Sequence, residues 1–140
     1  MSKSGPIIIV EDDQDDCHFL EKVLIDLKVE NERIWFTTAD AAFDHLLQTP
    51  LSTFIILCDI NLPGLNGIDF KKSIDANPYL RKKSIPFIFY STAAVQTVVN
   101  EAYSNVSVQG FFKKSNSFEE TKLMISTIFN YWKICRHPNM

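Results

Sequence analysis

The chain has 140 residues, of which 46% are hydrophobic, and this length and composition suit one domain with a single core but leave no room for a second. Its formal net charge of −3, with 22% charged residues, argues against a nucleic-acid-binding surface and against a disordered chain. The longest apolar runs are about a quarter of the roughly 20 residues needed to cross a bilayer, and the N-terminus lacks a signal-peptide pattern, so we expect a cytoplasmic protein that binds no membrane.

Two sequence patterns alternate along the chain. Short runs of aliphatic and aromatic residues are typical of buried strands, whereas apolar residues that recur every three or four positions predict helices. In chain order we expect a strand at 7–10, a helix at 19–27, a strand at 34–37, a helix at 39–47, a strand at 54–58, a helix at 68–76, a strand at 87–90, a helix at 95–103, a strand at 108–112 and a helix at 118–132. Asn77 followed by Pro78 is expected to end the third helix.

This alternation predicts an α/β fold, with a five-stranded parallel sheet that is covered by helices on both faces. Ligands of such sheets bind at the carboxyl ends of the strands. The polar residues found there are Glu11 and Asp12 after the first strand, Asp59 after the third, Ser91 after the fourth and Lys114 after the fifth. We therefore expect acids, a hydroxyl and an amine to converge at one edge of the sheet.

The acids at this edge are expected to hold a metal ion. Two carboxylates about 4 Å apart repel each other by roughly 4 kcal/mol at an effective dielectric constant of 20, so a pocket shared by Glu11, Asp12 and Asp59 favours a cation. Hard oxygen ligands suit Mg²⁺ or Mn²⁺ and are poor ligands for zinc. A carboxylate in such a pocket can also accept a phosphoryl group as a nucleophile, with Lys114 as counter-charge and Ser91 as a hydrogen-bond donor.

Each of these residues also has a simpler interpretation. Acids before a helix commonly cap it, an aspartate before Asn61 can simply form a turn, and lysines are usually solvated. The joint placement of acids, Asp59, a hydroxyl and Lys114 at four strand ends favours a functional site. Asp15 and Asp16 are interpreted as solvated acids of the first helical turn, and no histidine is assigned a role.

Four segments together resemble the receiver domain of two-component response regulators, the CheY-like fold. They are IVEDD at 9–13, CDINLPGLNG at 58–67, PFIFYST at 86–92 and GFFKKS at 110–115. The resemblance covers nearly the whole chain. It implies a flavodoxin-like sheet of strand order 2-1-3-4-5 and one receiver domain over 1–140, with a core from about 5 to 132 and a short tail at 133–140.

The resemblance also implies roles for individual residues. Asp59 is the expected acceptor of a phosphoryl group from a histidine kinase or a phosphotransfer protein. The other implied roles are Glu11 and Asp12 as the acidic pair, Asp12 as a direct Mg²⁺ ligand, Asn61 as a ligand through its backbone carbonyl, Ser91 as the switch hydroxyl, Phe111 as the switch aromatic and Lys114 as the site lysine. The protein is expected to assist its own phosphorylation and dephosphorylation without acting as an enzyme on other substrates.

Two register choices accompany these roles. The acidic pair is best matched by the first two acids after the strand, although Asp12 with Asp13 stays open as an alternative. The spacing from Gly110 selects Lys114 over Lys113. Phosphorylation is expected to remodel the face made by the helix at 95–103, the fifth strand and the last helix, and so to change contact with an unidentified output protein.

One residue departs from the family pattern. The family usually has proline after the lysine, joined by a cis bond, whereas Ser115 stands there in this chain. Because a cis bond costs about 3–4 kcal/mol before a non-proline residue against about 0.5–1 kcal/mol before proline, the bond between Lys114 and Ser115 is either strained or trans.

The Lys-Ser pair and the tail FNYWKICRHP at 129–138 resemble single-domain regulators that partner phytochrome-type histidine kinases. Tyr131, Trp132 and Ile134 extend past the usual last helix of the family, and the aromatic residues there either pack on the protein's own sheet or pair two chains as a homodimer.

Three other functions are compatible with parts of this sequence. Mg²⁺-dependent phosphatases with an aspartate nucleophile typically need a second aspartate two residues on, where this chain has Asn61, and the chain has no room for a cap. A flavin or nucleotide carrier is disfavoured because EDDQDD at 11–16 would repel a phosphate. A degenerate receiver that binds partners without phosphorylation stays open because of Ser115.

Overall fold

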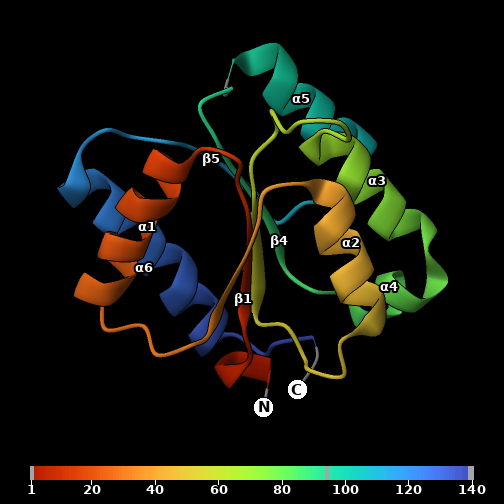
Figure 1. The fold of residues 1–140 in the computed structure, drawn as a ribbon, viewed down its shortest axis with the longest axis horizontal. Helices are drawn as coiled ribbons and strands as arrows, with labels where there is room; N and C mark the ends of the chain where they lie inside the picture. Colours follow the sequence, from red (N-terminus) through yellow and green to blue (C-terminus); the bar gives the residue numbers. More distant parts are fainter. Residues whose placement is uncertain (1, 94, 139–140) are drawn as a thin grey trace.

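A computed structural model describes residues 2–93 and 95–138 (Figure 1). The strands are β1 (Ile7–Val10), β2 (Arg33–Phe36), β3 (Ile55–Cys58), β4 (Phe87–Ser91) and β5 (Gly110–Lys113). The helices are α1 (Gln14–Asp26), α2 (Ala39–Gln48), α3 (Gly67–Ala76), α4 (Pro78–Lys83), α5 (Gln96–Asn105) and α6 (Phe118–Ile134), and a single 3₁₀ turn (Ser2–Ser4) precedes β1.

The five strands form one parallel sheet of order β2-β1-β3-β4-β5, which confirms the predicted fold. Every residue of β1, β3 and β4 is buried, because helices cover both faces of the sheet. Val10 lies beside Cys58, so β1 and β3 end at the same level, whereas Cys58 lies beside Phe89 and β4 continues beyond that level to Ser91. The residues that follow β1 and β3 and the last residue of β4 therefore lie at the same edge of the sheet.

Helices divide into two layers, one on each face of the sheet (Figure 1). One face packs on α1 and α6, where Leu24 and Ile125 are fully buried with the odd-numbered residues of β1. The opposite face packs on α2, α3, α4 and α5 and contains the aromatic side chains of Phe70, Phe87 and Phe89. Side chains of each strand alternate between these two cores, as the period of a strand requires.

Side-chain caps fix where most of the helices begin. The capping residues are Asp13 for α1, Thr38 for α2, Asn66 for α3, Asn77 for α4 and Ser117 for α6, and each accepts a hydrogen bond from a backbone N–H of the first turn. No side chain caps α5 in this way, and Ala102 is its one buried residue among those described. This helix is therefore the least firmly attached part of its layer.

The short helix α4 is absent from the elements expected from the sequence. Asn77 and Pro78 end α3 as predicted, but the same two residues also begin α4. The Asn77 side chain accepts from the N–H of Leu80 at 3.1 Å, and Pro78 occupies the first turn, where the missing N–H of proline costs nothing. The expectation of five helices was therefore wrong, because a residue pair that stops one helix also starts another.

The last described residues pack near the edge of the sheet at which the strands begin (Figure 1). His137 is buried, and its Nε2 lies 2.7 Å from the carbonyl oxygen of Phe54. Trp132 is half-buried and packs on the α1–α6 core, whereas Tyr131 and Ile134 are exposed. Residues 139 and 140 of the expected tail lie outside the described residues. Within the described part of the chain, we find no helix that has the length and apolar character needed to span a membrane.

Candidate functional site

Backbone hydrogen bonds extend the sheet by one residue beyond three of its strands. The N–H of Glu11 donates to Phe36 at 2.9 Å, the N–H of Asp59 donates to Val10 at 3.0 Å, and the N–H of Lys114 donates to Ser91 at 3.0 Å. Glu11, Asp59 and Lys114 are thus fixed by the same ladder that holds the strands. Their side chains project from a rigid edge, as precise positioning of reacting groups requires.

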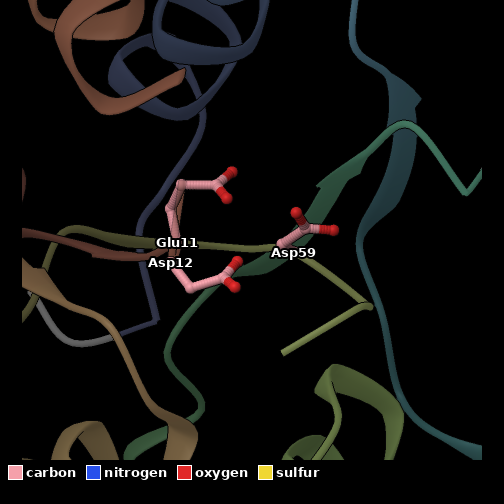
Figure 2. A group of neighbouring side chains, drawn as sticks. All are labelled: Glu11, Asp12 and Asp59. Carbon is pink, nitrogen blue, oxygen red and sulfur yellow. The ribbon is translucent and has the colours of Figure 1, made fainter. Parts of the chain in front are cut away.

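Three carboxylates gather at this edge. Figure 2 shows Glu11 and Asp12 extending from the end of β1 toward Asp59, and one oxygen from each residue lies within 4.8 Å of the others. Glu11 and Asp59 are 6% and 7% exposed, whereas Asp12 is open to solvent. A set of carboxylate oxygens with one open side fits Mg²⁺ or Mn²⁺, which bind through few protein ligands and keep several waters.

The carboxylate of Asp59 is held in one orientation by its own loop and by β4. Its Oδ1 accepts from the hydroxyl of Ser91 at 2.5 Å, from the N–H of Ile60 at 2.6 Å and from the N–H of Asn61 at 3.3 Å. Ser91 is fully buried, so its hydroxyl has little freedom to turn elsewhere. The other oxygen, Oδ2, is left to face Lys114.

The ammonium of Lys114 bridges the carboxylates. Its Nζ lies 3.1 Å from Oδ2 of Asp59 and 2.8 Å from Oδ2 of Asp16, and it also donates to Glu11. Burial alone would lower the pKa of Lys114, but hydrogen bonds to Asp16 and Glu11 and the charges of Glu11 and Asp59 together raise it. The lysine therefore stays positively charged and is the positive charge that partly neutralises this pocket.

Glu11 has a carboxyl group that is difficult to ionise. Burial raises its pKa to about 7, the hydrogen bond and charge of Lys114 oppose this shift, and the charge of Asp59 adds to it. Burial is the largest cause of this shift, and the opposing effect of Lys114 does not cancel it. A divalent cation beside Glu11 and Asp59 would favour the ionised form that burial disfavours.

Asp16 and Asp13 occupy different environments although they belong to the same acidic run. Asp16 was expected to be a solvated acid of the first turn; it lies in that turn with its side chain 43% exposed, but it also bonds Lys114, a contact that was not expected. Asp13 instead caps α1 by accepting from the N–H of Asp16 at 3.1 Å. The first turn of α1 brings Asp16 within reach of Lys114. This position could be predicted from the sequence only if the residue at which α1 begins were known.

The remaining candidate residues lie around this center. Asn61 is exposed next to Asp59, and Phe111 is half-buried against Phe89, with ring centroids 5.6 Å apart. The described residues contain no cis peptide bond, so the bond between Lys114 and Ser115 is trans. Lys114 reaches the carboxylates from this trans backbone.

A close backbone approach explains the glycine after Asn66. The loop that carries Asp59 folds back on α3, and the N–H of Gly67 donates to the carbonyl of Ile60 at 2.9 Å. A Cβ atom on Gly67 would lie 2.2 Å from the carbonyl oxygen of Asp59. Only glycine fits here without a shift of the loop, so Gly67 belongs to the structure that positions Asp59.

The doubly wound sheet and the acidic pocket at its carboxyl edge define an α/β protein of the CheY-like receiver type. A sequence model of the response regulator receiver domain matches residues 7–126, and the chain belongs to that family. The resemblance inferred from the four sequence segments is thereby confirmed.

Individual relatives agree with this assignment. The response regulator Rcp1 of Synechocystis sp. is 27% identical over 132 residues, which cover 90% of this chain and 87% of Rcp1. The Mn²⁺-bound crystal structure of Rcp1 has a TM-score of 0.80 and 26% identity, and it covers 95% of this chain and 98% of that chain. The phosphorylated cyanobacterial phytochrome response regulator RcpA is similar in fold, with a TM-score of 0.83, 23% identity and coverage of 95% and 97%.

A fold likeness also extends to a receiver that holds magnesium. The receiver domain of the sensor histidine kinase PA1611 from Pseudomonas aeruginosa has a magnesium ion coordinated in its active-site cleft. Its TM-score is 0.72 at 20% identity, and the match covers 91% of this chain and 95% of that chain. Mn²⁺ is thus bound by the related protein Rcp1, and Mg²⁺ is bound by a protein of similar fold.

The close approach at Gly67 predicts a selective effect of a single methyl group. Gly67→Ala should lower the free energy of unfolding in urea by about 2 kcal/mol, because the added Cβ must displace the carbonyl of Asp59. On the same helix, Lys72 is half-exposed, and Lys72→Ala should change stability by less than about 0.5 kcal/mol. Equal stability of Gly67→Ala and wild type would show that the loop yields freely.

Proposed function

We propose that this protein is a response regulator that accepts a phosphoryl group on Asp59 in a reaction that requires Mg²⁺ or Mn²⁺. The observation that carries the proposal is the position of the Asp59 carboxylate, which lies between two further acids, the Ser91 hydroxyl and the Lys114 ammonium. We further propose that residues 5–132 form the core of one receiver domain and that the protein acts as a phosphoacceptor, without an enzymatic activity on other substrates.

In the proposed reaction the N–P bond of a phosphohistidine breaks, and a bond forms between phosphorus and a carboxylate oxygen of Asp59. The histidine nitrogen keeps the electron pair of the broken bond. The hydrogen bonds from Ser91 and Ile60 hold Asp59 in a fixed orientation before the donor arrives. This preorganisation lowers the entropic cost of aligning the nucleophile with the N–P bond.

Glu11, Asp12 and Asp59, with the backbone carbonyl of Asn61, are the residues that would hold the cation. When bound, it neutralises negative charge on the phosphoryl oxygens. Lys114 supplies a second positive charge and keeps its proton, since its pKa is raised. Its ammonium is expected to shift from the carboxylates to a phosphoryl oxygen, because the phosphoryl group brings more negative charge than the carboxylate oxygen it replaces as a partner.

The switch to an output signal is proposed to start at Ser91. Its hydroxyl now donates to Asp59 and would turn to a phosphoryl oxygen after phosphorylation. Phe111, which is only half-buried, would then follow inward against Phe89. The face made by α5, β5 and α6 would change as a result. The helix α5 is suited to such movement, since among its described residues only Ala102 is buried and the partly buried Val98 also packs on the core.

The energy of the new contacts is of the size that a switch needs. Converting a two-state protein from 1:99 to 99:1 requires about 5.5 kcal/mol of differential interaction. A charge-assisted hydrogen bond contributes about 1.5–3 kcal/mol. Ser91 and Lys114 already bond carboxylates, so their bonds to the phosphoryl group contribute by the amount by which they exceed those bonds.

The proposed donor is a histidine kinase or a phosphotransfer protein, and the phytochrome-type kinases are favoured among them. This choice is supported by the similarity to Rcp1 and by the fold likeness to RcpA, which is a phytochrome response regulator. The output partner would contact the α5–β5–α6 face. A homodimer through Tyr131 and Ile134, whose side chains are exposed, remains a proposal.

Two rival functions are less compatible with this site. An aspartate-nucleophile phosphatase typically needs an acid two residues after the nucleophile, and Asn61 stands there with its backbone N–H toward Asp59. A degenerate receiver was kept open because of Ser115. The side chain of Lys114 nonetheless reaches Asp59 on a trans backbone, which removes the main reason for that alternative.

Phosphorylation can be tested with a small donor. After incubation with acetyl phosphate and Mg²⁺, intact mass spectrometry should detect one added phosphoryl group on wild type and none on Asp59→Asn. The variant keeps the size of the side chain but lacks a carboxylate nucleophile. Failure of wild type to react with acetyl phosphate, phosphoramidate and every kinase tried would favour the degenerate receiver.

The cation site can be tested by a pair of neighbouring substitutions. Asp12→Asn should weaken Mg²⁺ binding, measured by isothermal titration calorimetry, by at least the roughly tenfold that loss of even an outer-shell partner costs. Asp13→Asn is the matched control, because Asn also caps a helix and Asp13 points to the N–H of Asp16. If Asp13→Asn were the weaker binder, the acidic pair would be Asp12 with Asp13 instead of Glu11 with Asp12.

The kinase assignment is tested by comparing donors. Radiolabelled phosphoryl transfer from a phytochrome-type histidine kinase to wild type should be faster than transfer from unrelated histidine kinases at equal concentrations, because matched docking surfaces raise the local concentration of the donor histidine. Asp59→Asn should remain unlabelled with each donor. Equal rates from all kinases would remove the phytochrome link and leave the phosphoacceptor role intact.

A further inference from the structure

Ser115 occupies the turn that leads from β5 into α6, and three hydrogen bonds hold it there. Its hydroxyl donates to Oε2 of Glu120 at 2.6 Å and accepts from the N–H of Ser117 at 3.0 Å. Its carbonyl accepts the longer branch, at 3.3 Å, of a bond from the hydroxyl of Thr121, whose nearer acceptor is the carbonyl of Ser117 at 2.9 Å. Thr121 is fully buried. Both the side chain and the backbone of Ser115 are therefore tied to the first turns of α6.

These bonds modify the usual capping arrangement of a helix. In a capping box the first-turn glutamate accepts directly from the N–H of the capping residue. Here Ser117 is the cap and bonds the N–H of Glu120 at 3.2 Å, but the N–H of Ser117 bonds Ser115 instead of the glutamate. Glu120 in turn accepts from the Ser115 hydroxyl. The Ser115 hydroxyl thus bridges the two members of the capping box, the N–H of Ser117 and the carboxylate of Glu120.

This bridging residue, Ser115, directly follows Lys114 in the chain. On one side the N–H of Lys114 bonds the carbonyl of Ser91, and on the other side Ser115 is fixed to α6. The backbone of Lys114 is held between β4 and the helix. The direction in which its side chain leaves the chain is set by these two attachments, and the ammonium reaches Asp59 and Glu11 from there.

We propose that Ser115 and Glu120 are positioning residues for Lys114, and that their hydrogen bond takes over the task of orienting the lysine in a chain that has no proline at this turn. The catalytic consequence rests on the phosphoacceptor function proposed above. Glu120 is exposed and touches neither Asp59 nor any other acid of the pocket among the contacts described. Its effect on the site passes through Ser115 and the backbone of Lys114.

The pair can be tested with variants that remove or keep the bond. Ser115→Ala and Glu120→Ala remove it, Ser115→Thr keeps the hydroxyl, and Glu120→Gln keeps an acceptor oxygen. Ser126→Ala is the matched control on α6, since Ser126 is a serine that bonds only the carbonyl of Leu123 in its own helix. For each variant we would measure the rate constant of phosphorylation by acetyl phosphate, the Mg²⁺ dissociation constant and the melting temperature.

The expected result is a selective loss of rate. Ser115→Ala and Glu120→Ala should be phosphorylated about tenfold more slowly, since displacement of a reacting group by about 1 Å costs up to 100-fold. Ser115→Thr, Glu120→Gln and Ser126→Ala should stay within about threefold of wild type. Mg²⁺ affinity should not fall in any of the five, because Lys114, a positive charge that competes with the cation, is displaced and the acidic pair is not. Rates equal to wild type in both alanine variants, or a parallel loss of rate and Mg²⁺ affinity, would overturn the proposal.

A second measurement is independent of phosphorylation. The Lys114 ammonium is hydrogen-bonded to carboxylates, so its ¹⁵N-resolved NMR signal should exchange slowly with water in wild type and in Ser115→Thr. In Ser115→Ala the exchange should accelerate. An unchanged ammonium signal in Ser115→Ala would contradict the positioning role. If wild type were never phosphorylated but the signal changed as expected, the phosphoacceptor function would fail and the positioning of Lys114 would stand.

Discussion

Repulsion among Glu11, Asp12 and Asp59 is the interaction on which the arrangement of the site depends. The parallel sheet brings the ends of β1 and β3 side by side, and the acids that follow these strands cannot avoid one another. One ammonium, that of Lys114, offsets part of the charge, and burial, with a smaller contribution from the charge of Asp59, raises the pKa of Glu11 to about 7. A protein that holds so much unbalanced negative charge is prepared for a divalent cation and for chemistry in which charge is redistributed.

The same acidic run serves two unrelated purposes. Asp13 caps α1, whereas Asp16, one turn further on, bonds the lysine of the pocket. Capping fixes the start of α1, and the start of α1 determines that Asp16 faces the strand ends. Local helix formation and the geometry of the site are therefore coupled through a single turn. This coupling explains why five acids can be packed into six residues without being redundant.

Much of the fold and the site could be predicted from the sequence, because both depend on short-range patterns. Strands that are buried on both faces are continuous apolar runs, and the polar residue after each run marks the carboxyl edge of the sheet. The missed features depend on context. Pro78 reads as a stop although it also begins α4, the role of Asp16 depends on the exact turn of α1, and the burial of His137 arises from packing against Phe54. Tertiary contacts of this kind leave no periodic signal.

The burial of His137 changes where the folded unit ends. Sequence patterns place the end of the core near Trp132. The buried ring of His137 nonetheless packs against Phe54 and against Trp132, so the core includes residues beyond Trp132. The segment that follows Trp132 and contains His137 is therefore packed on the core and is not a loose tail. Truncation of the protein after Trp132 would expose the ring of Phe54, which lies just before the start of β3. Any tag or fusion partner joined at that point would replace native packing with a linker.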